Sequence, residues 1–479
     1  MAEQPMLKFV NVPRDMPKKR EAEERREDFR EIYAEYAEAK AQEQASRCSQ
    51  CGVPYCQTHC PLHNNIPDWL KLTAEGRLRE ADEVSQATNT FPEICGRICP
   101  QDRLCEGNCV IEQSGHGTVT IGSVEKYITD TAWEEGWVKP ITPARERAES
   151  VGIIGAGPGG LAAADVLRRA GVQVTVYDRY DRAGGLLTYG IPGFKLEKDV
   201  VMRRNAQLEA GGVNFVLNCD VDADIFASIH AEHDAVIIAT GVYKSRELSM
   251  PNAEAEGVVK AIDFLTASNR KSFGDDVPEF DSGALNAEGK RVVVIGGGDT
   301  AMDCVRTSIR QGATSVKCLY RRDRAHMPGS QREVQNAEEE GVVFDWLRAP
   351  KGFTTDGDAV AGVMVQQMRL GQPDATGRQA PELIEGADYV EEADLVIKAL
   401  GFEPEALPTL WGQPELEVTR WGTVKAEFTT GKTAMDGVYA VGDIVRGASL
   451  VVWAIRDGRD CAEAILETMD TRAEVMAAE

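Results

Sequence analysis

Eight cysteines lie within residues 48–109 at short intervals, and this feature limits most strongly what the chain can fold into. The two runs read Cys48-x2-Cys51-x4-Cys56-x3-Cys60 and Cys95-x3-Cys99-x5-Cys105-x3-Cys109. Proline follows directly after Cys60 and after Cys99. Residues 1–10 lack the basic and apolar regions of a secretory signal, so we expect a cytoplasmic location. In a reducing compartment, thiols arranged in this way are expected to bind metals rather than to form disulfides.

Two groups of four thiolates suit either two [4Fe–4S] clusters or two zinc ions. Zinc sites usually combine two C-x2-C knuckles, whereas the two runs contain only one C-x2-C. A dense run followed by proline is more similar to bacterial ferredoxins, in which the last cysteine of a run ligates the other cluster. We therefore predict iron–sulfur clusters, with zinc and unligated thiols as alternatives. The spacing leaves open whether each run holds its own cluster or the two runs exchange ligands.

A glycine-rich turn after residue 150 stands between an apolar strand and a helix. Gly155, Gly157 and Gly160 form the pattern G-x-G-x-x-G. These glycines allow a tight turn, a close approach of the backbone to a pyrophosphate and close helix–strand packing. The free N–H groups of the helix N-terminus also favour an anion. Asp178 ends the next strand and can accept a hydrogen bond from a ribose hydroxyl, so the unit predicts a dinucleotide site.

A second unit of the same kind begins at residue 291. Its turn contains Gly296, Gly298, Asp299, Thr300 and Ala301. Arg321 and Arg322 stand at the end of its second strand, where the first unit has an acid. An acid would repel a 2′-phosphate, whereas arginine binds one through charge-assisted hydrogen bonds. We therefore predict that the second nucleotide is NADPH rather than NADH, with solvated surface arginines as the alternative.

Two further elements indicate that the first site holds FAD. Thr240 and Gly241 follow one apolar strand, and Gly442 and Asp443 follow another. An acid in this position can hold the ribityl or diphosphate part of a flavin, and the helix that follows can face the pyrimidine ring. The set resembles the family of flavoproteins with two dinucleotide-binding domains, in which such residues mark FAD.

Longer motifs make the resemblance more specific. They cover residues 45–61, 91–100, 105–109, 184–192 and 448–455. On these motifs the chain resembles, over essentially its full length, the small-subunit family of NADPH-dependent bacterial glutamate synthases. The module is also similar to the N-terminal half of dihydropyrimidine dehydrogenase and to related NADPH:ferredoxin-type modules. The resemblance implies that Gly185 and Leu186 belong to the FAD site.

The resemblance to dihydropyrimidine dehydrogenase also implies which residues hold each cluster. One cluster takes Cys48, Cys51, Cys56 and Cys109. The other takes Cys60, Cys99 and Cys105, together with a side chain from an Ile-Gly-x-x-Gln segment. This sequence has Glu125 in place of that glutamine, and the carboxylate is either the fourth ligand or a plain helix-surface acid. With Glu125 as the ligand, Cys95 is left without a cluster.

The expected fold class is α/β, with two interleaved Rossmann-like nucleotide-binding domains preceded by a helical iron–sulfur domain. The expected domains are 1–145 for the clusters, 146–255 and 408–479 for FAD, and 256–407 for NADPH. The NADPH domain is inserted because the Gly442–Asp443 element follows the second glycine turn. Near the N-terminus, residues 18–47 are rich in charge and helix formers, which predicts a surface helix docked by one face.

The charge balance narrows the possible partners. The chain has 53 basic and 77 acidic residues, a formal net charge of −24, and no long basic block, so we expect no binding to nucleic acid or an anionic membrane surface. No apolar run is long enough to span a bilayer. No residue is assigned as a catalytic acid, base or nucleophile, because the cofactors would carry the chemistry.

The resemblance implies an electron-input subunit that oxidises NADPH. Its hetero-oligomeric partner is then a large subunit that makes L-glutamate from L-glutamine and 2-oxoglutarate. One alternative is the NADPH-oxidising subunit of a pyrimidine dehydrogenase or of a ferredoxin:NADP oxidoreductase. Another is a zinc-stabilised structural or adaptor protein.

Overall fold

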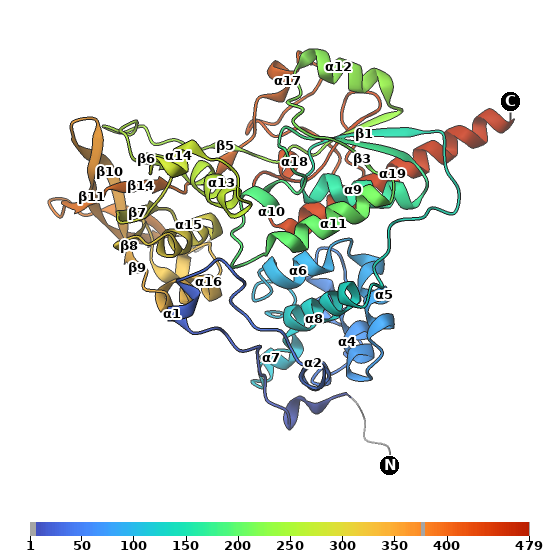
Figure 1. Cartoon of the computed structure of the whole chain (residues 1–479), viewed down its shortest axis with the longest axis horizontal. Helices are drawn as coiled ribbons and strands as arrows, with labels where there is room; N and C mark the ends of the chain where they lie inside the picture. The colour runs from blue at the N-terminus through green and yellow to red at the C-terminus, as the bar shows by residue number, and fades with distance from the viewer. Residues whose placement is uncertain (1–5, 375–378, 479) are drawn as a thin grey trace.

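The computed structural model describes residues 6–374 and 379–478, which form three lobes (Figure 1). One lobe is helical, and each of the other two is built on a parallel sheet. The predicted fold class is therefore confirmed. Parts 1–5, 375–378 and 479 of the predicted domains lie outside the described residues.

The helical lobe is built from short helices around one apolar core. Its helices are α1 (Ala22–Arg25), α2 (Glu38–Ala45), α3 (Tyr55–Thr58), α4 (Ile66–Ala74), α5 (Leu78–Thr88), α6 (Pro92–Ile98), α7 (Val110–Gln113) and α8 (Ile121–Glu134), with a short 3-10 turn (Lys8–Val10) before them. Trp69 and Leu70 of α4 and Val124 and Ile128 of α8 are almost completely buried together. The apolar residues of α8 recur four apart, so they lie on one face of the helix.

The prediction of a helix over residues 18–47 is wrong. Only two short parts of this stretch are helical, α1 and α2, and residues 18–37 form an arm that is extended apart from α1. Hydrogen bonds from Arg20 N to Ile32 O (2.9 Å) and from Ala34 N to Lys18 O (2.9 Å) fold the arm back on itself. Its tip, with α1, lies against the second sheet-containing lobe (Figure 1), where Arg25 pairs with Glu339 at 2.8 Å. These distant ion pairs override the local helix propensity.

The first nucleotide unit has a five-stranded parallel sheet in the order β16-β4-β1-β2-β3. Its strands are β1 (Ser150–Ile154), β2 (Gln173–Tyr177), β3 (Asn214–Val216), β4 (Ala235–Ile238) and β16 (Val438–Ala440). Its helices are α9 (Pro158–Arg169), α10 (Leu186–Tyr189), α11 (Lys198–Ala210), α12 (Ala223–Glu232), α17 (Leu407–Leu410), α18 (Asp443–Arg446) and α19 (Val451–Ala478). Strands β1, β4 and β16 carry apolar side chains on both faces, as expected for a sheet covered on both sides.

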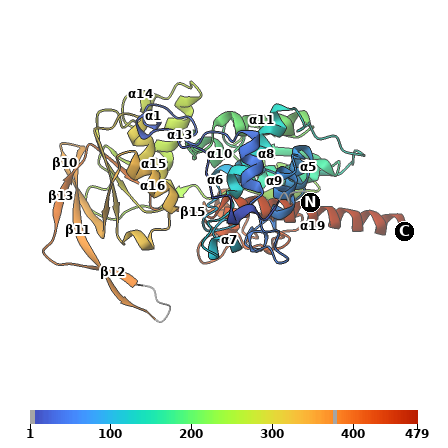
Figure 2. The ribbon, with the colours of Figure 1, turned by 90° about the horizontal axis from the view of Figure 1, so that it is seen from below.

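The second nucleotide unit repeats this plan and carries an antiparallel extension. Its parallel sheet has the order β6-β14-β7-β8-β9. The strands are β6 (Val258–Lys260), β7 (Arg291–Ile295), β8 (Ser315–Tyr320), β9 (Val343–Trp346) and β14 (Leu395–Lys398), and the helices are α13 (Ala261–Ser272), α14 (Pro278–Asp281), α15 (Asp299–Arg310) and α16 (Gln331–Glu339), with a 3-10 turn (Arg324–His326). The extension consists of β10 (Arg348–Asp356), β11 (Ala359–Pro373), β12 (Gln379–Leu383) and β13 (Tyr389–Glu392). It projects from this lobe on the side away from α19 (Figure 2).

The chain passes from the first unit to the second and back again. The two crossings lie side by side as the antiparallel pair β5 (Lys244–Ser245) and β15 (Phe402–Glu403). After the return, β16 pairs with β4 and so completes the first sheet. The two units are therefore interleaved, whereas the exact domain boundaries at residues 145, 255 and 407 stay a prediction.

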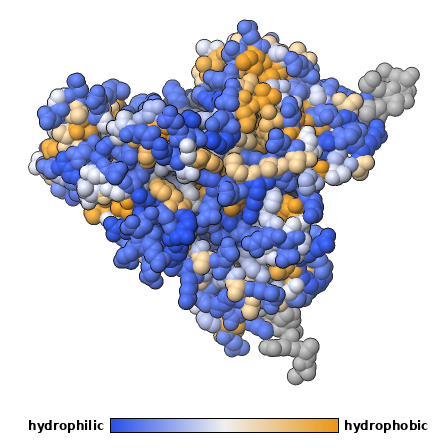
Figure 3. Space-filling model, in the orientation of Figure 1, coloured by the Kyte–Doolittle hydropathy of each residue, from blue (hydrophilic) through white to orange (hydrophobic). Residues whose placement is uncertain are grey.

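The surface of the molecule is mostly polar. On the face shown in Figure 3, an apolar area lies over the top of the first unit, where α12 and α17 lie, and smaller apolar areas are scattered elsewhere. Leu410 of α17 is 54% exposed. Within the described parts of the chain, we find no helix with the length and apolar character needed to cross a membrane.

Candidate functional site: a cavity shared by three lobes

A cavity of about 530 Å³ opens at the carboxyl ends of β1, β4 and β16. Ligands bind at this end of the strands in open α/β sheets. Of the residues predicted for the two nucleotide sites, its lining includes Gly155, Gly157, Asp178, Leu186, Thr240, Gly241, Asp299, Thr300, Gly442 and Asp443. Cys99, Pro100 and Gln101 of the helical lobe line it as well. Part of each glycine turn and one cysteine of the second run thus face a common space, whereas Gly160, Gly185, Gly296, Gly298 and Ala301 do not line it.

The first glycine turn has the steric requirements that its sequence indicates. Gly155 has φ +112°, and a Cβ there would collide with the carbonyl oxygen of Ala239. A Cβ on Gly160 would strike the carbonyl oxygen of Gly155. In contrast, a Cβ on Gly157 would meet no heavy atom within 4 Å. The backbone of Gly157 therefore faces open space at the N-terminus of α9, as a phosphate cradle requires.

Asp178 braces this turn from the end of β2. Its Oδ2 accepts a hydrogen bond from Ala156 N at 2.6 Å, and its Oδ1 accepts one from Tyr180 N at 2.9 Å. Burial raises the pKa of Asp178, although these two backbone donors favour the charged carboxylate. The side chain also lines the cavity, where it is available to a ribose hydroxyl.

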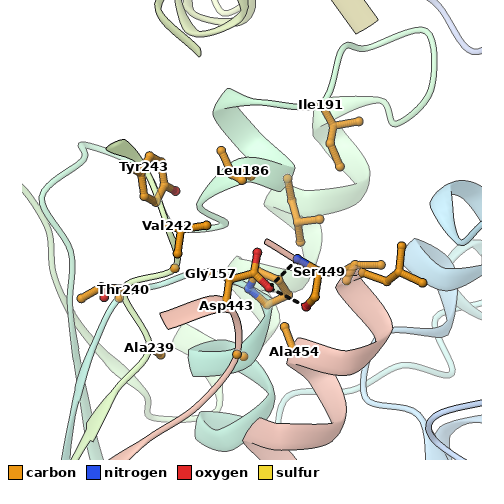
Figure 4. Close-up of a pocket in the computed structure, with 18 of the residues that line it drawn as sticks. Gly157, Leu186, Ile191, Ala239, Thr240, Val242, Tyr243, Asp443, Ser449 and Ala454 are labelled. Carbon is orange, nitrogen blue, oxygen red and sulfur yellow. Dashed lines mark hydrogen bonds between the residues drawn. The ribbon is translucent and has the colours of Figure 1, made fainter. Parts of the chain in front are cut away.

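Opposite the glycine turn, residues from several segments converge (Figure 4). Gly185, with φ +53°, packs against the backbone of Gly157 and precedes Leu186, the first residue of α10. Asp443 accepts hydrogen bonds from Ser449 N (3.2 Å) and Ser449 Oγ (2.6 Å), and burial raises its pKa. Thr240 Oγ1 is buried and has no hydrogen-bond partner within the described chain. An unpaired buried hydroxyl at a cavity wall fits a site that a polar ligand completes.

The second glycine turn repeats the geometry of the first. Gly296 has φ +151°, and a Cβ there would collide with the carbonyl oxygen of Ala399. A Cβ on Gly298 would meet nothing within 4 Å, so this backbone also faces open space. Ala301 is completely buried beneath the turn, which explains the small residue. Asp299 Oδ1 accepts a hydrogen bond from Ser330 N at 2.9 Å, which fixes the following loop beside the turn.

The two arginines after β8 do not line the large cavity. Arg321 is exposed and Arg322 is half-buried. The Nε of Arg322 is buried without a partner in the described residues. Both arginines are thus placed at the carboxyl edge of the second sheet, where the acid of the first unit stands.

The cysteines divide into two groups that cross the two runs. A small cavity of about 20 Å³ is lined by Cys48, Cys51, Cys56 and Cys109. Burial is the main reason why the pKa of Cys56 rises to about 12, and the nearby thiols of Cys48 and Cys109 add to it. Across the described residues, no three His, Cys, Asp or Glu side chains are close enough together to hold a single metal ion.

The second group surrounds Glu125, on α8. Burial raises the pKa of Cys60 to about 12 and also raises that of Cys105, and the charge of Glu125 adds to both shifts. The pKa of Cys99 rises because of a hydrogen bond with Cys95, then because of burial and the charge of Glu125. The structure therefore brings the three predicted thiols and the carboxyl together, with Cys95 next to them.

Sequence reasoning missed an ion pair in the cavity wall. Lys195 Nζ lies 2.8 Å from Asp303 Oδ1, and both residues line the cavity between the two glycine turns. Burial raises the pKa of Asp303 to about 6, although Lys195 opposes this shift. Asp303 follows Asp299 by four residues on α15, so helical periodicity could have placed it on the same face. Lys195 has no local signal of this kind.

The fold and the site define a pyridine-nucleotide oxidoreductase joined to an iron–sulfur domain. Residues 25–137 match the family described as dihydropyrimidine dehydrogenase domain II, 4Fe-4S cluster, and residues 149–458 match the pyridine nucleotide-disulphide oxidoreductase family. The structure of Mycobacterium tuberculosis FprA in complex with NADPH shares this fold, with a TM-score of 0.57 and 20% identity over 69% of this chain and 86% of that chain.

Two curated relatives match almost the whole chain. The glutamate synthase [NADPH] small chain of Azospirillum brasilense is 65% identical over 475 residues, which cover 99% of this chain and 98% of that protein. The putative oxidoreductase AegA of Escherichia coli is 45% identical over 473 residues, which cover 96% of this chain and 70% of that protein. The chain belongs to the glutamate synthase [NADPH] small-chain family.

Proposed function

We propose that this chain is the electron-input subunit of a glutamate synthase. In this role, NADPH gives a hydride to FAD, and two [4Fe–4S] clusters carry the electrons to a large subunit that makes L-glutamate from L-glutamine and 2-oxoglutarate. The small-chain relative at 65% identity supports the biological role. The protein's own residues would bind and orient the cofactors and exclude water from the cavity in which they meet.

One observation carries this proposal. The cavity at the first glycine turn is lined by Thr300 of the second glycine turn and by Cys99 of the second cysteine run. A donor nucleotide, a flavin and an iron–sulfur cluster bound by these residues would meet in one place. Electron transfer through protein needs such proximity, and no titrating catalytic residue is required.

The nucleotide sites fit the predicted groups. For FAD we assign Gly155, Gly157, Gly160, Asp178, Gly185, Leu186, Thr240, Gly241, Gly442 and Asp443. For NADPH we assign Gly296, Gly298, Asp299, Thr300, Ala301, Arg321 and Arg322. The open faces of Gly157 and Gly298 and the unpaired polar atoms of Thr240 and Arg322 support these assignments.

The grouping of the thiols supports two clusters with exchanged ligands. Cys48, Cys51, Cys56 and Cys109 would hold the first cluster, because these four line one small cavity. Cys60, Cys99, Cys105 and Glu125 would hold the second. The second group lies next to the flavin cavity through Cys99, so the first group would be the later step of the relay. We further propose a cytoplasmic hetero-oligomer with the large subunit and no nucleic-acid or membrane partner.

The test uses the purified chain with and without the large subunit. Alone, the chain should oxidise NADPH with ferricyanide and form no glutamate from glutamine and 2-oxoglutarate. Adding the large subunit should produce glutamate. Cys56→Ser should keep ferricyanide reduction and lose glutamate formation, whereas Cys461→Ala, which changes a cysteine outside both runs, should keep both. Glutamate formation by the isolated chain, or loss of ferricyanide reduction in Cys56→Ser with normal flavin content, would refute the proposal.

A second candidate function follows from AegA, which carries a similar module within a larger protein. The module could then feed electrons to another acceptor, such as a pyrimidine dehydrogenase or ferredoxin. The large chain that co-purifies with this protein separates the two candidates, because only the first requires a glutamate-forming partner.

A further inference from the structure

The two carboxylate oxygens of Glu125 have different surroundings. Oε1 accepts hydrogen bonds from Asn64 Nδ2 at 3.0 Å and from Asn89 Nδ2 at 3.4 Å. No hydrogen bond is found for Oε2 in the part of the chain that the structure describes. Glu125 as a whole residue is 6% exposed, so this second oxygen has only slight contact with solvent. One oxygen is thus held by protein, and the other is left for a ligand of its own.

The orientation of the Asn89 amide is fixed by the backbone. Its Oδ1 accepts a hydrogen bond from Phe91 N at 3.0 Å, and a backbone N–H can only donate. The Nδ2 end must therefore face Glu125. The Asn64 amide has a matching arrangement, in which its Oδ1 accepts from Thr88 Oγ1 at 2.5 Å and its Nδ2 donates to Glu125. Both amides are almost completely buried, so these donors have little freedom to turn away.

Asn89 also contacts the competing thiol. Cys95 Sγ lies 3.8 Å from Asn89 Oδ1 as a hydrogen-bond donor, and Cys95 neighbours Cys99. This contact holds the Cys95 side chain against the Asn89 amide. The same amide therefore offers a donor to Glu125 and an acceptor to Cys95.

We propose that Asn64 and Asn89 are positioning residues for the second cluster. They hold Glu125 by Oε1 so that Oε2 binds the iron that Cys60, Cys99 and Cys105 leave without a protein ligand. Through its Oδ1, Asn89 holds the Cys95 side chain outside the ligand set. This inference rests on the proposed ligand role of Glu125. It adds the reason why the carboxylate of Glu125, rather than the thiol of Cys95, is the ligand. Outer partners of this kind orient metal ligands and tune the centre.

The experiment uses the full chain purified with the large subunit. Asn89→Asp and Asn64→Asp each replace a donor by an acceptor of the same shape and should push the carboxylate of Glu125 away. We expect the electron paramagnetic resonance spectrum of one reduced cluster to change. Iron content should fall from about eight toward about four per chain, as two four-iron clusters imply. Asn64→Ser removes a donor without adding a charge and should shift the spectrum in the same direction.

The matched control is Asn65→Asp. Asn65 precedes α4, its Oδ1 accepts a hydrogen bond from Gln57, and it has no hydrogen bond to Glu125. The control should keep the parent spectrum and iron content. Flavin content reports folding in every variant, because the residues assigned to FAD all lie in the first nucleotide unit. A variant that loses flavin as well as iron is replaced in the comparison by Asn64→Ser.

Two further variants separate this inference from the ligand assignment. Glu125→Ala should alter the same cluster, and Cys95→Ser should keep about eight irons per chain. A normal spectrum in Glu125→Ala would overturn the ligand role and the inference with it. Glu125→Ala could instead alter the spectrum while Asn64→Asp, Asn64→Ser and Asn89→Asp keep the parent spectrum. That result would leave the ligand role of Glu125 intact and overturn the positioning role of the two asparagines. Loss of a cluster in Cys95→Ser would show that the thiol is a ligand and refute the selection by Asn89.

Discussion

Gly298→Ala should separate nucleotide binding from folding. Gly298 caps α15 with φ −90° and ψ 177°, which alanine adopts without strain, and its Cβ would meet no heavy atom within 4 Å. We expect the free energy of unfolding to stay within about 1 kcal/mol of the parent, since such a change mainly restricts the unfolded chain. The methyl group would occupy the space through which a pyrophosphate approaches the backbone. Loss of one charge-assisted hydrogen bond costs about 1.5–3 kcal/mol, which corresponds to a KM for NADPH roughly tenfold to a hundredfold higher.

Gly296→Ala is the matched control, two residues earlier in the same turn. Gly296 has φ +151°, and an added Cβ would collide with the carbonyl oxygen of Ala399. The substitution should therefore destabilise the fold by about 1–3 kcal/mol. The assays are NADPH:ferricyanide kinetics and thermal unfolding followed by circular dichroism. An unchanged KM in Gly298→Ala would show that NADPH does not approach this backbone. If Gly298→Ala lowered the melting temperature as much as Gly296→Ala does, the added methyl group at residue 298 would have to collide with other atoms.

Three further predictions test other parts of the structure. Arg321→Ala should raise the KM for NADPH about tenfold to a hundredfold and leave that for NADH unchanged, and equal effects in steady-state kinetics would mean that the arginine does not read the 2′-phosphate. Gly157→Ala should lower the flavin-to-protein absorbance ratio without lowering the melting temperature of the flavin-free chain, and normal flavin content would contradict the open cradle. Burial opposes ionisation of Glu340, but Arg306 and Arg310 hold its pKa at about 2, below the usual 4.5. Its stabilising contribution is therefore complete above about pH 4.5 and is lost as the pH falls through 2. Glu340→Gln should lower stability at pH 7 by about 3–5 kcal/mol and flatten this acid loss in denaturant titrations, and a parallel pH profile would contradict the assignment.

The nucleotide units could be predicted because their signals are local. The turns at Gly155 and Gly296 need positive φ and close packing, and these requirements leave glycine at fixed spacing in the sequence. The return of the chain into the first sheet was also predictable, because the Gly442–Asp443 element follows the second turn. The arm over residues 18–37 was not, because its conformation depends on partners about 300 residues away, such as Glu339. The pairing of Lys195 with Asp303 likewise joins residues that only the folded chain brings together.

The cysteines fall between these two cases. Their spacing predicts that two groups of four ligands exist, but spacing alone cannot assign Cys109 to the first run or Cys60 to the second. That assignment depends on how α3, α4 and the turns around residues 99–109 pack, which is a property of the lobe and not of either run. The proposed choice between Glu125 and Cys95 needs still more, because it depends on the direction in which two buried amides point.

The helical lobe and its arm also hold the second nucleotide unit in place. Lys19 and Arg25 of the arm pair with Glu339 of α16, and Arg25 also lies 3.3 Å from Glu340. Arg103, between the second-run cysteines Cys99 and Cys105, donates to the carbonyl oxygen of Pro328, beside the second glycine turn. The Arg25 side chain is 2% exposed and Glu340 is completely buried, where Arg306 and Arg310 also pair with Glu340. Breaking a buried pair of this kind costs about 3–5 kcal/mol. The position of the second unit over the shared cavity is therefore fixed by the lobe that carries the cysteines, as well as by the two covalent crossings.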